Sequence, residues 1–517
     1  MGLVALIKRL QDIMRQDQGV DGDVQRLAQL VWLIFLKVYD FNEEENEFSN
    51  DDYKPVIPKG YRWRDWANPL TDEGKPDVKN QLTGDDLISF VDNKLLPVLK
   101  GNPINVGGEL TFVFKSNDDR AKLVKAVMSD AVNLMKNGYL LRSVLNILNE
   151  VNLGLASDQH EFSEMYEKLL DGLQAMGKYG EFHTPRAITR FAVDKIAPKL
   201  GETMADWACG TGGFMVDVID TLSSQTRVGH NEDYEQLQNS VRGGEFKPMP
   251  FRLCITNLLL HGINLPNVHY GDSLDIKNFS EYYGDDLVDI ACLNPPYGGV
   301  ASESDKLSFP TDMRSSETAD LFVALTVKRL NKNGRAIVVV PDSLLFGTEG
   351  SKTAVKEYLM KECNLHTVIR LPKSCFSPYA SIATNLLFFD KTGPTEETWF
   401  YRFDMPEGYK HFSKTKPILR EHFAPVDEWW NNRVEIKDVK EHEDMSDTWK
   451  AKKYTIDEIK ENGYKLDLCG YPVEEKIILS PEDTIRNFKE EQERLEKLMD
   501  QHLFDILNIL GIGDKND

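Results

Sequence analysis

Two short segments of this sequence carry residue types whose spacing could do chemistry. The first is NPPY at residues 294–297, where an asparagine, two prolines and a tyrosine directly follow the apolar run VDIACL. Proline has no backbone N–H and a fixed φ, so a buried strand that ends this way must leave its sheet in a stiff, narrowly defined loop. Asn294 and Tyr297 are therefore predicted to be held at a strand end, as an amide acceptor and an aromatic surface.

The second segment is a glycine-rich turn, ADWACGTGGF at residues 205–214. Asp206 ends a predicted strand, Gly210, Gly212 and Gly213 follow, and a helical stretch begins at Phe214. Glycines let the backbone come close to a ligand, and the amides of a helix N-terminus face its polar or anionic part. The turn is neither the GxGxxG of dinucleotide enzymes nor a phosphate-binding P-loop, and by itself it could equally be a tight turn without a ligand.

The elements that must position these segments alternate between strands and helices. Seven strands are predicted, at residues 203–208, 241–246, 267–272, 287–294, 334–341, 365–371 and 384–390. Helical segments such as residues 319–330 separate them. This order predicts an α/β fold with a doubly wound, mostly parallel, seven-stranded Rossmann-like sheet. Ligands bind at the carboxyl ends of the strands in such sheets, and both segments fall at those ends.

The flanking regions have a different character. Residues 1–160 show helical spacing of apolar residues, interrupted by a polar loop over residues 42–79, and predict a helical domain without obvious strands. The α/β domain is expected over residues 161–395 and a mixed extension over 396–479. Residues 480–517 predict a terminal helix with apolar residues at heptad spacing, which packs either on a partner's helices or on the chain's own core.

Composition and charge exclude several classes of protein. The 517 residues are 41% hydrophobic, which indicates a globular protein of several domains. The apolar run at residues 30–36 is too short to span a membrane and no signal peptide precedes it, so a cytoplasmic protein is expected. Six scattered cysteines and ten histidines show no metal-ligand spacing, and no metal is predicted. A formal net charge of -22 predicts weak binding to nucleic acid by the chain alone.

Taken in their order along the chain, the motifs resemble the modification (methyltransferase) subunit of type I restriction-modification systems. The resemblance covers nearly the whole chain and is most specific between GEFHTPRAITRFAV at residues 180–193 and TNLLFFD at 384–390. It implies an adenine-specific DNA methyltransferase that uses S-adenosylmethionine as cofactor and methylates the N6 amine of adenine in double-stranded DNA. It also implies three partners: a specificity subunit that selects the target sequence, a second modification subunit bound to it, and restriction subunits.

The resemblance implies which residues bind the cofactor. The loop around its methionine part consists of Glu181, Phe182, His183, Thr184, Pro185 and Arg186. The glycine turn contributes Asp206, Gly210, Thr211, Gly212 and Gly213. Glu245 is the acid for the ribose, and Asp272 is the acid near the adenine. Glu245 follows Gly212 by 33 residues, whereas the acid of dinucleotide folds follows its turn by about 20. Glu232 therefore remains an alternative for the ribose.

The resemblance also makes Asn294, Pro295, Pro296 and Tyr297 the catalytic segment. An exocyclic adenine amine is a poor nucleophile because its lone pair is delocalised into the ring. If the Asn294 amide oxygen and the Pro295 carbonyl accept its two hydrogens, the lone pair can point at the donor methyl without a strong base. Tyr297 would stack on an adenine that has left the duplex.

Two other functions are compatible with part of the pattern. A protein methyltransferase acting on a glutamine amide also uses NPPY, and a non-catalytic assembly subunit could keep the same fold. The long N-terminal region and the terminal heptad helix argue against the first function. The intact glycine turn and the intact NPPY argue against the second.

Overall fold

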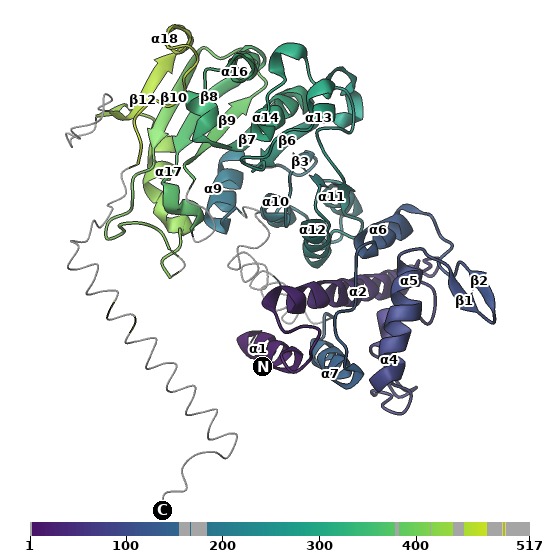
Figure 1. Cartoon of the computed structure of the whole chain (residues 1–517). Coiled ribbons are helices and arrows are strands. Elements are labelled where there is room, and N and C mark those ends of the chain that lie inside the picture. Colours follow the sequence, from purple (N-terminus) through teal and green to yellow (C-terminus); the bar gives the residue numbers. More distant parts are fainter. Residues whose placement is uncertain are drawn as a thin grey trace, which may run out of the picture.

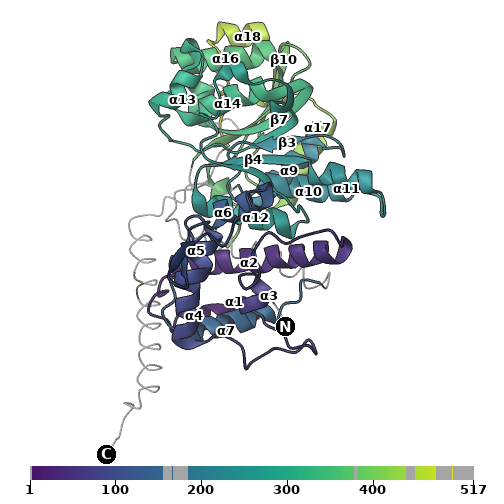
Figure 2. The ribbon, with the colours of Figure 1, turned by 90° about the vertical axis from the view of Figure 1, so that its right-hand side faces the viewer.

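The structure is a computed structural model of the chain. It describes residues 3–154, 166, 184–377, 382–413, 415–437, 449–472, 489 and 492. A helical region at the amino-terminal end adjoins an α/β region built on one large sheet (Figures 1 and 2). Apart from residues 489 and 492, the predicted terminal helix lies outside the described residues.

The large sheet has ten strands in the order β11-β12-β10-β8-β9-β7-β6-β3-β4-β5. Its strands are β3 Met204–Asp206, β4 Val241–Glu245, β5 Asn267–Tyr270, β6 Val288–Leu293, β7 Leu330–Pro341, β8 Asn364–Arg370, β9 Thr384–Asp390, β10 Glu397–Arg402, β11 Ile436–Lys437 and β12 Trp449–Thr455. From β5 through β4, β3 and β6 to β7 the pairing is parallel, and β9 runs antiparallel between β7 and β8. The predicted α/β class and all seven predicted strands are confirmed.

The sheet is wider than the predicted seven strands. β10, β11 and β12 come from residues 396–479, where a separate mixed extension was expected, and they continue the sheet beyond β8. β10 pairs in parallel with β8, from Trp399 opposite Thr367 to Arg402 opposite Arg370. The predicted count is too low because β11 has only two residues, β12 is polar and all three strands follow the last recognisable motif, whereas β8 needs a neighbour on its outer edge.

The strand order places the two chemical segments side by side. From β3 the chain continues outward to β4 and β5, whereas from β6 it continues to β7 on the other side. β3 and β6 are direct neighbours, with Met204 opposite Ile290. Their carboxyl ends therefore form the switch point at which open α/β sheets bind ligands. The glycine turn leaves β3 there, and the NPPY loop leaves β6 there.

Helices cover both faces of the sheet. Ile290 and Cys292 of β6 lie in one hydrophobic core and Ala291 and Leu293 lie in the other, which is the two-residue period of a strand buried on both faces. The first core contains α9 Arg186–Ile196, α10 Gly213–Ser223 and α17 Ala424–Asn431, and the second contains α14 Thr318–Arg329 and α16 Gly350–Glu362. The shorter helices are α11 Asn231–Gln238, α13 Glu303–Ser308, α15 Asp342–Phe346 and α18 Ile456–Glu461.

The amino-terminal region is helical, as predicted, with two differences. Its helices are α1 Leu3–Met14, α2 Asp23–Ser49, α3 Trp63–Trp66, α4 Gly84–Phe90, α5 Leu96–Leu99, α6 Asp119–Met128 and α7 Gly138–Asn149, with a π-helical stretch Val91–Leu95 joining α4 to α5. The polar loop expected from residue 42 begins only after α2 ends at Ser49. A small hairpin, β1 Ile104–Val106 and β2 Glu109–Thr111, also occurs here.

The apolar run at residues 30–36 lies in α2, where every residue from Leu30 to Asp40 is buried. No helix within the described ranges is long and apolar enough to cross a membrane. In Figures 1 and 2, α2 lies between α1 and α7 on one side and the sheet region on the other. Its all-round burial explains why its sequence is apolar on every face.

The helix α12 Pro248–Leu260 packs against both regions. Phe251 and Ile255 belong to the core of the helical region, whereas Cys254 and Leu258 belong to the core beneath the sheet. Arg252 donates from Nε to the Val127 carbonyl over 2.8 Å. Because α12 follows β4 and packs against both cores, the helical region is fixed close to the strand ends that carry the site.

Candidate active site

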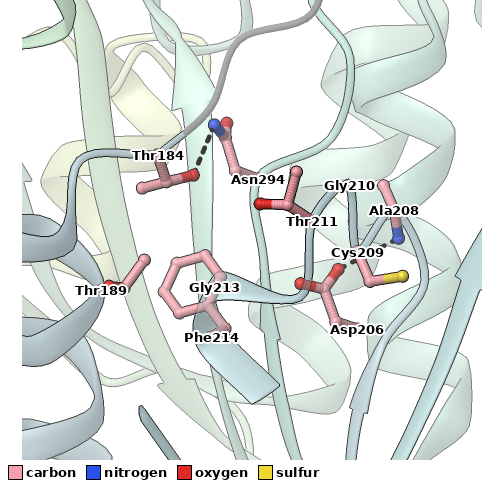
Figure 3. A pocket seen from close by; sticks show the side chains of 10 residues that line it. All are labelled: Thr184, Thr189, Asp206, Ala208, Cys209, Gly210, Thr211, Gly213, Phe214 and Asn294. Atoms are coloured by element: carbon pink, nitrogen blue, oxygen red, sulfur yellow. Dashed lines mark hydrogen bonds between the residues drawn. The ribbon is translucent and has the colours of Figure 1, made fainter. Parts of the chain in front are cut away.

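A pocket with a volume of about 320 Å³, including its open mouth, lies at the switch point. Three parts of the chain line it: the start of α9, the glycine turn after β3 and the end of β6 (Figure 3). The lining residues are Thr184, Thr189, Asp206, Ala208, Cys209, Gly210, Thr211, Gly213, Phe214 and Asn294. The sheet topology thus brings both predicted chemical segments to one cavity.

Asp206 contributes a buried carboxyl to this pocket. It is 2% exposed, and its Oδ1 accepts the Ala208 N–H over 3.0 Å. Burial, assisted by the nearby Glu245 carboxylate, raises its pKa to about 8. No described lysine, arginine or histidine forms an ion pair with it. A buried carboxyl that faces a pocket without a cation is suited to a positively charged ligand group.

The glycine turn depends on backbone conformations that favour glycine. Gly210 and Gly212 have φ values of 55° and 83°. A Cβ at Gly212 would lie 3.0 Å from Cys254 Sγ on α12, whereas a Cβ at Gly210 would meet no atom within 4 Å. Gly212 is therefore required by close packing, and Gly210 leaves open space beside the pocket.

Glu245 connects the end of β4 to the glycine turn. Its Oε2 accepts the Gly210 N–H over 2.9 Å, and its Oε1 accepts the Lys247 N–H over 2.8 Å. The alternative, Glu232, is exposed in the first turn of α11. The structure therefore brings Glu245 to the glycine turn, although Glu245 itself is not among the lining residues.

Asp272 follows β5, two strands from β3. It is half-buried, its Oδ1 accepts the Leu274 N–H over 2.9 Å, and burial raises its pKa. It lies at the same edge of the sheet as the pocket but does not line it.

The NPPY loop is held by three hydroxyl groups. Asn294 donates from Nδ2 to Thr184 Oγ1 over 2.9 Å, a bond drawn in Figure 3. The Tyr297 hydroxyl donates to Asn294 Oδ1. On the far side, Thr318 Oγ1 donates to the Pro296 carbonyl over 3.0 Å. Among the described residues, nothing donates to the Pro295 carbonyl.

Tyr297 packs its ring against the core that contains α9 and α10. The ring is half-buried, and burial raises the pKa of the hydroxyl well above its usual value. The hydroxyl therefore stays protonated and can serve as a hydrogen-bond donor throughout the neutral range.

The first part of the predicted methionine loop, Glu181, Phe182 and His183, lies outside the described residues. Thr184 and Pro185 directly precede α9, and Thr184 lines the pocket. Arg186 does not line it. Its Nη1 donates to the Gly213 carbonyl over 2.7 Å and pairs with Asp217 over 3.2 Å. Arg186 thereby ties the start of α9 to the start of α10.

Four lining residues were not predicted from the sequence: Thr189, Ala208, Cys209 and Phe214. Three of them sit inside the quoted glycine turn segment, and Thr189 lies within α9. Helical spacing from Thr184 gives no signal for Thr189, because Thr184 precedes α9 and positions five apart on a helix lie about 140° apart. In the part of the chain that the structure describes, no group of three or more metal-ligating side chains occurs.

Known proteins resemble this chain over its whole length. The family model for N-6 DNA methylases matches residues 157–477. The chain is 44% identical over 516 residues to the type I restriction enzyme EcoEI methylase subunit of Escherichia coli, covering 100% of this chain and 99% of the relative.

Two solved structures extend the comparison to the fold. One is a modification subunit assigned to a type I restriction enzyme of Vibrio vulnificus YJ016, with a TM-score of 0.73, 36% identity and coverage of 93% of this chain and 97% of the other. The second comes from work on complex assembly and conformational transition in a type I restriction-modification system, with a TM-score of 0.75, 30% identity and coverage of 98% of both chains.

The chain therefore belongs to the N-6 DNA methylase family, as an adenine-specific DNA methyltransferase that is the modification subunit of a type I restriction-modification system. The resemblance seen in the motifs is confirmed. Its fold is that of the solved modification subunits of type I systems.

Proposed function

We propose that the pocket at the switch point binds S-adenosylmethionine and that the NPPY loop presents the N6 amine of a DNA adenine to it. The observation that carries this proposal is that Asn294, at the end of β6, lines the same pocket as the glycine turn at the end of β3. The pocket is therefore lined both by Asn294, which can accept a hydrogen from an amine, and by the glycine turn, which can bind a methyl donor.

The residues of the pocket fit this cofactor. Asp206 offers a buried carboxyl, without a cation of its own, to the cofactor's ammonium group. The open space at Gly210 allows the ligand to lie against the backbone. Glu245 accepts a backbone N–H at each carboxylate oxygen, beside the glycine turn, and we assign its carboxylate to the two ribose hydroxyls, because a carboxylate at a strand end can accept hydrogen bonds from a diol. We assign Asp272 to the adenine end of the cofactor.

S-adenosylmethionine would supply a methyl group made electrophilic by its positively charged sulfur. The protein's task is to make the adenine amine nucleophilic. The Pro295 carbonyl, which no described residue uses, can accept one N6 hydrogen, and Asn294 Oδ1 can accept the other. Fixed dipoles at both hydrogens draw the nitrogen toward tetrahedral geometry, and confinement in the pocket aligns it with the methyl group.

Tyr297 has to change partners when the adenine arrives. Its hydroxyl donates to Asn294 Oδ1, the same atom that receives the adenine amine. For its ring to stack on the base, Tyr297 gives up this bond. The adenine amine then replaces the Tyr297 hydroxyl as the donor to Asn294 Oδ1. Stacking on an aromatic side chain contributes about 1–3 kcal/mol per base, which offsets the loss.

We also propose the partners that this chain needs. A separate specificity subunit selects the target sequence and binds two copies of the chain, and restriction subunits complete the nuclease. The support is the similarity to a chain from a type I complex and the net charge of -22, which opposes DNA binding by the chain alone. Residues 480–517, of which only 489 and 492 are among the described residues, are the proposed docking helix.

The test is methyl transfer from labelled S-adenosylmethionine by the chain assembled with its specificity subunit. We expect label in N6-methyladenine of the DNA, identified by mass spectrometry of the digested nucleosides. Label in glutamine of added or endogenous protein, with none in the DNA, would contradict the proposal.

A further inference from the structure

Thr184 lies between the proposed cofactor site and the proposed catalytic amide. Its Oγ1 accepts a hydrogen from Asn294 Nδ2 over 2.9 Å, and its side chain lines the pocket at 8% exposure (Figure 3). Pro185 caps the start of α9 next to it, and Arg186 fastens that start to the Gly213 carbonyl. The threonine is therefore held in a fixed position relative to the glycine turn.

Only one of the three hydrogen-bonding positions of the Thr184 hydroxyl is used among the described residues. A hydroxyl has one O–H donor and two acceptor positions, and the bond from Asn294 uses one acceptor position. Within the described ranges, the O–H of Thr184 has no acceptor. A nearly buried hydroxyl without an acceptor is unfavourable, so this O–H is suited to an acceptor on a ligand in the pocket.

Once the Tyr297 hydroxyl has given up its bond to Asn294 Oδ1, the direction of the Thr184 O–H decides how the asparagine amide is oriented. An unconstrained hydroxyl can either accept from Nδ2 or donate to Oδ1, and both orientations of the amide are then satisfied. A hydroxyl whose O–H is committed elsewhere can only accept, which requires Nδ2 of Asn294 to face Thr184. Oδ1 of Asn294 then faces away from Thr184, where it can accept a hydrogen from the adenine amine.

We infer that Thr184 links cofactor binding to base recognition: its hydroxyl donates to a carboxylate oxygen of the bound cofactor and, for that reason, accepts from Asn294 and fixes the amide with its oxygen toward the adenine amine. Thr184 is thus a cofactor contact and a positioning residue for Asn294. The inference rests on the proposed function.

The test measures binding in the assembled complex rather than turnover. Duplexes carrying adenine or purine at the target position differ by the N6 amine alone, so their affinity ratio reports the hydrogen bonds of that amine. The ratio is measured with and without S-adenosylhomocysteine, which has the same carboxylate but no methyl group to transfer. In the unaltered protein, we expect this ligand to raise the ratio by about fivefold or more, which is in the usual range of coupling between two sites.

Three variants separate linkage from structure. Thr184→Val keeps the shape and removes the hydroxyl, so the ratio should no longer respond to S-adenosylhomocysteine. Thr184→Ser keeps the hydroxyl and should keep the response. Thr326→Val is the matched control, because Thr326 is fully buried in α14 and bonds only the Phe322 carbonyl over 2.7 Å; its response should be unchanged.

Each other result overturns the inference. A response that persists in Thr184→Val, a response absent from the unaltered protein, or a response lost equally in Thr184→Ser or Thr326→Val would show that Thr184 does not act as the link. Failure of the proposed function is distinguishable, since in that case Asn294→Ala would leave the adenine-to-purine ratio unchanged.

Discussion

The two walls of the pocket are held in different ways. The cofactor wall, residues 206–213 with Glu245, is fixed mainly through the backbone, by left-handed glycines and by N–H groups that donate to Glu245. The substrate wall, residues 294–298, is held by the hydroxyls of Thr184, Tyr297 and Thr318. The cofactor binds to a site that the backbone turn has already formed. The adenine, by contrast, has to replace the Tyr297 hydroxyl at Asn294 Oδ1. Hydrogen bonds from hydroxyl groups can be exchanged in this way, whereas a backbone turn cannot.

Breaking the backbone of the cofactor wall should have the largest effect on stability. Gly212→Ala combines a left-handed residue, which costs roughly 1–2 kcal/mol, with a Cβ 3.0 Å from Cys254 Sγ. We expect a loss of about 2–4 kcal/mol in the free energy of unfolding, from strain plus overpacking, and weaker cofactor binding. Denaturant unfolding and calorimetric titration measure the two quantities.

Gly229→Ala is the control for this change. Gly229 has a φ of 79°, but a Cβ there would meet no atom within 4 Å. This variant should lose only the strain of about 1–2 kcal/mol and bind cofactor normally. If both variants behave alike, the packing of the glycine turn on α12 is not what fixes the cofactor wall.

The charge of the cofactor wall predicts a dependence on pH. Asp206 has a pKa of about 8 in the empty protein because it is buried. A folded-state pKa above the unfolded value means that this group stabilises the empty protein at low pH and that the contribution is lost as pH rises through 8. A cationic ligand favours the ionised carboxylate, so cofactor affinity should rise by up to about tenfold per pH unit between pH 6 and 8.

Calorimetry at pH 7 in buffers of different ionisation enthalpy checks this prediction, because binding should release close to one proton from Asp206. Asp206→Asn should abolish both the proton release and the rise in affinity, provided that the cofactor's own ionisation is subtracted. Unchanged proton release in that variant would place the ammonium group elsewhere.

The smallest effect is expected on the substrate wall at Thr318. Thr318→Val removes the hydrogen bond to the Pro296 carbonyl, which is partly exposed and contributes about 0.5–1.5 kcal/mol. The rate of methyl transfer at saturating cofactor should fall by about two- to tenfold, with cofactor affinity unchanged. Single-turnover kinetics measure the rate, and Thr318→Ser should restore it. A fall in cofactor affinity instead would mean that the two walls are not held separately.

The sequence predicts the central strands and both chemical segments because each strand is an apolar run that ends abruptly in residues able to do chemistry. It does not predict β10, β11 and β12 as part of the sheet, because β12, WKAKKYT, is polar and β11 has only two residues. The local sequence pattern is enough to predict the central strands, whereas β10, β11 and β12 form strands because they pair with the edge of the sheet.

The same distinction applies to the site. Asp206 and the glycines could be assigned from one contiguous turn. The bond between Thr184 and Asn294 joins residues 110 positions apart, and it depends on how α9 is fastened to α10 through Arg186. The exchange of donors at Asn294 depends on the orientation of the Tyr297 side chain, which no spacing in the sequence indicates.

The central claim is that one pocket contains a cofactor wall and a substrate wall with separate tasks. The most direct test is Asn294→Ala in the assembled complex, with cofactor affinity and the rate of methyl transfer measured on the same preparation and with Asn462→Ala, an exposed asparagine after α18, as control. We predict cofactor affinity within about twofold of the unaltered protein and transfer slowed by about 10²- to 10³-fold, the usual loss when one preorganised hydrogen-bonding group is removed. Near-normal transfer, or a loss explained entirely by weaker cofactor binding, would contradict the account.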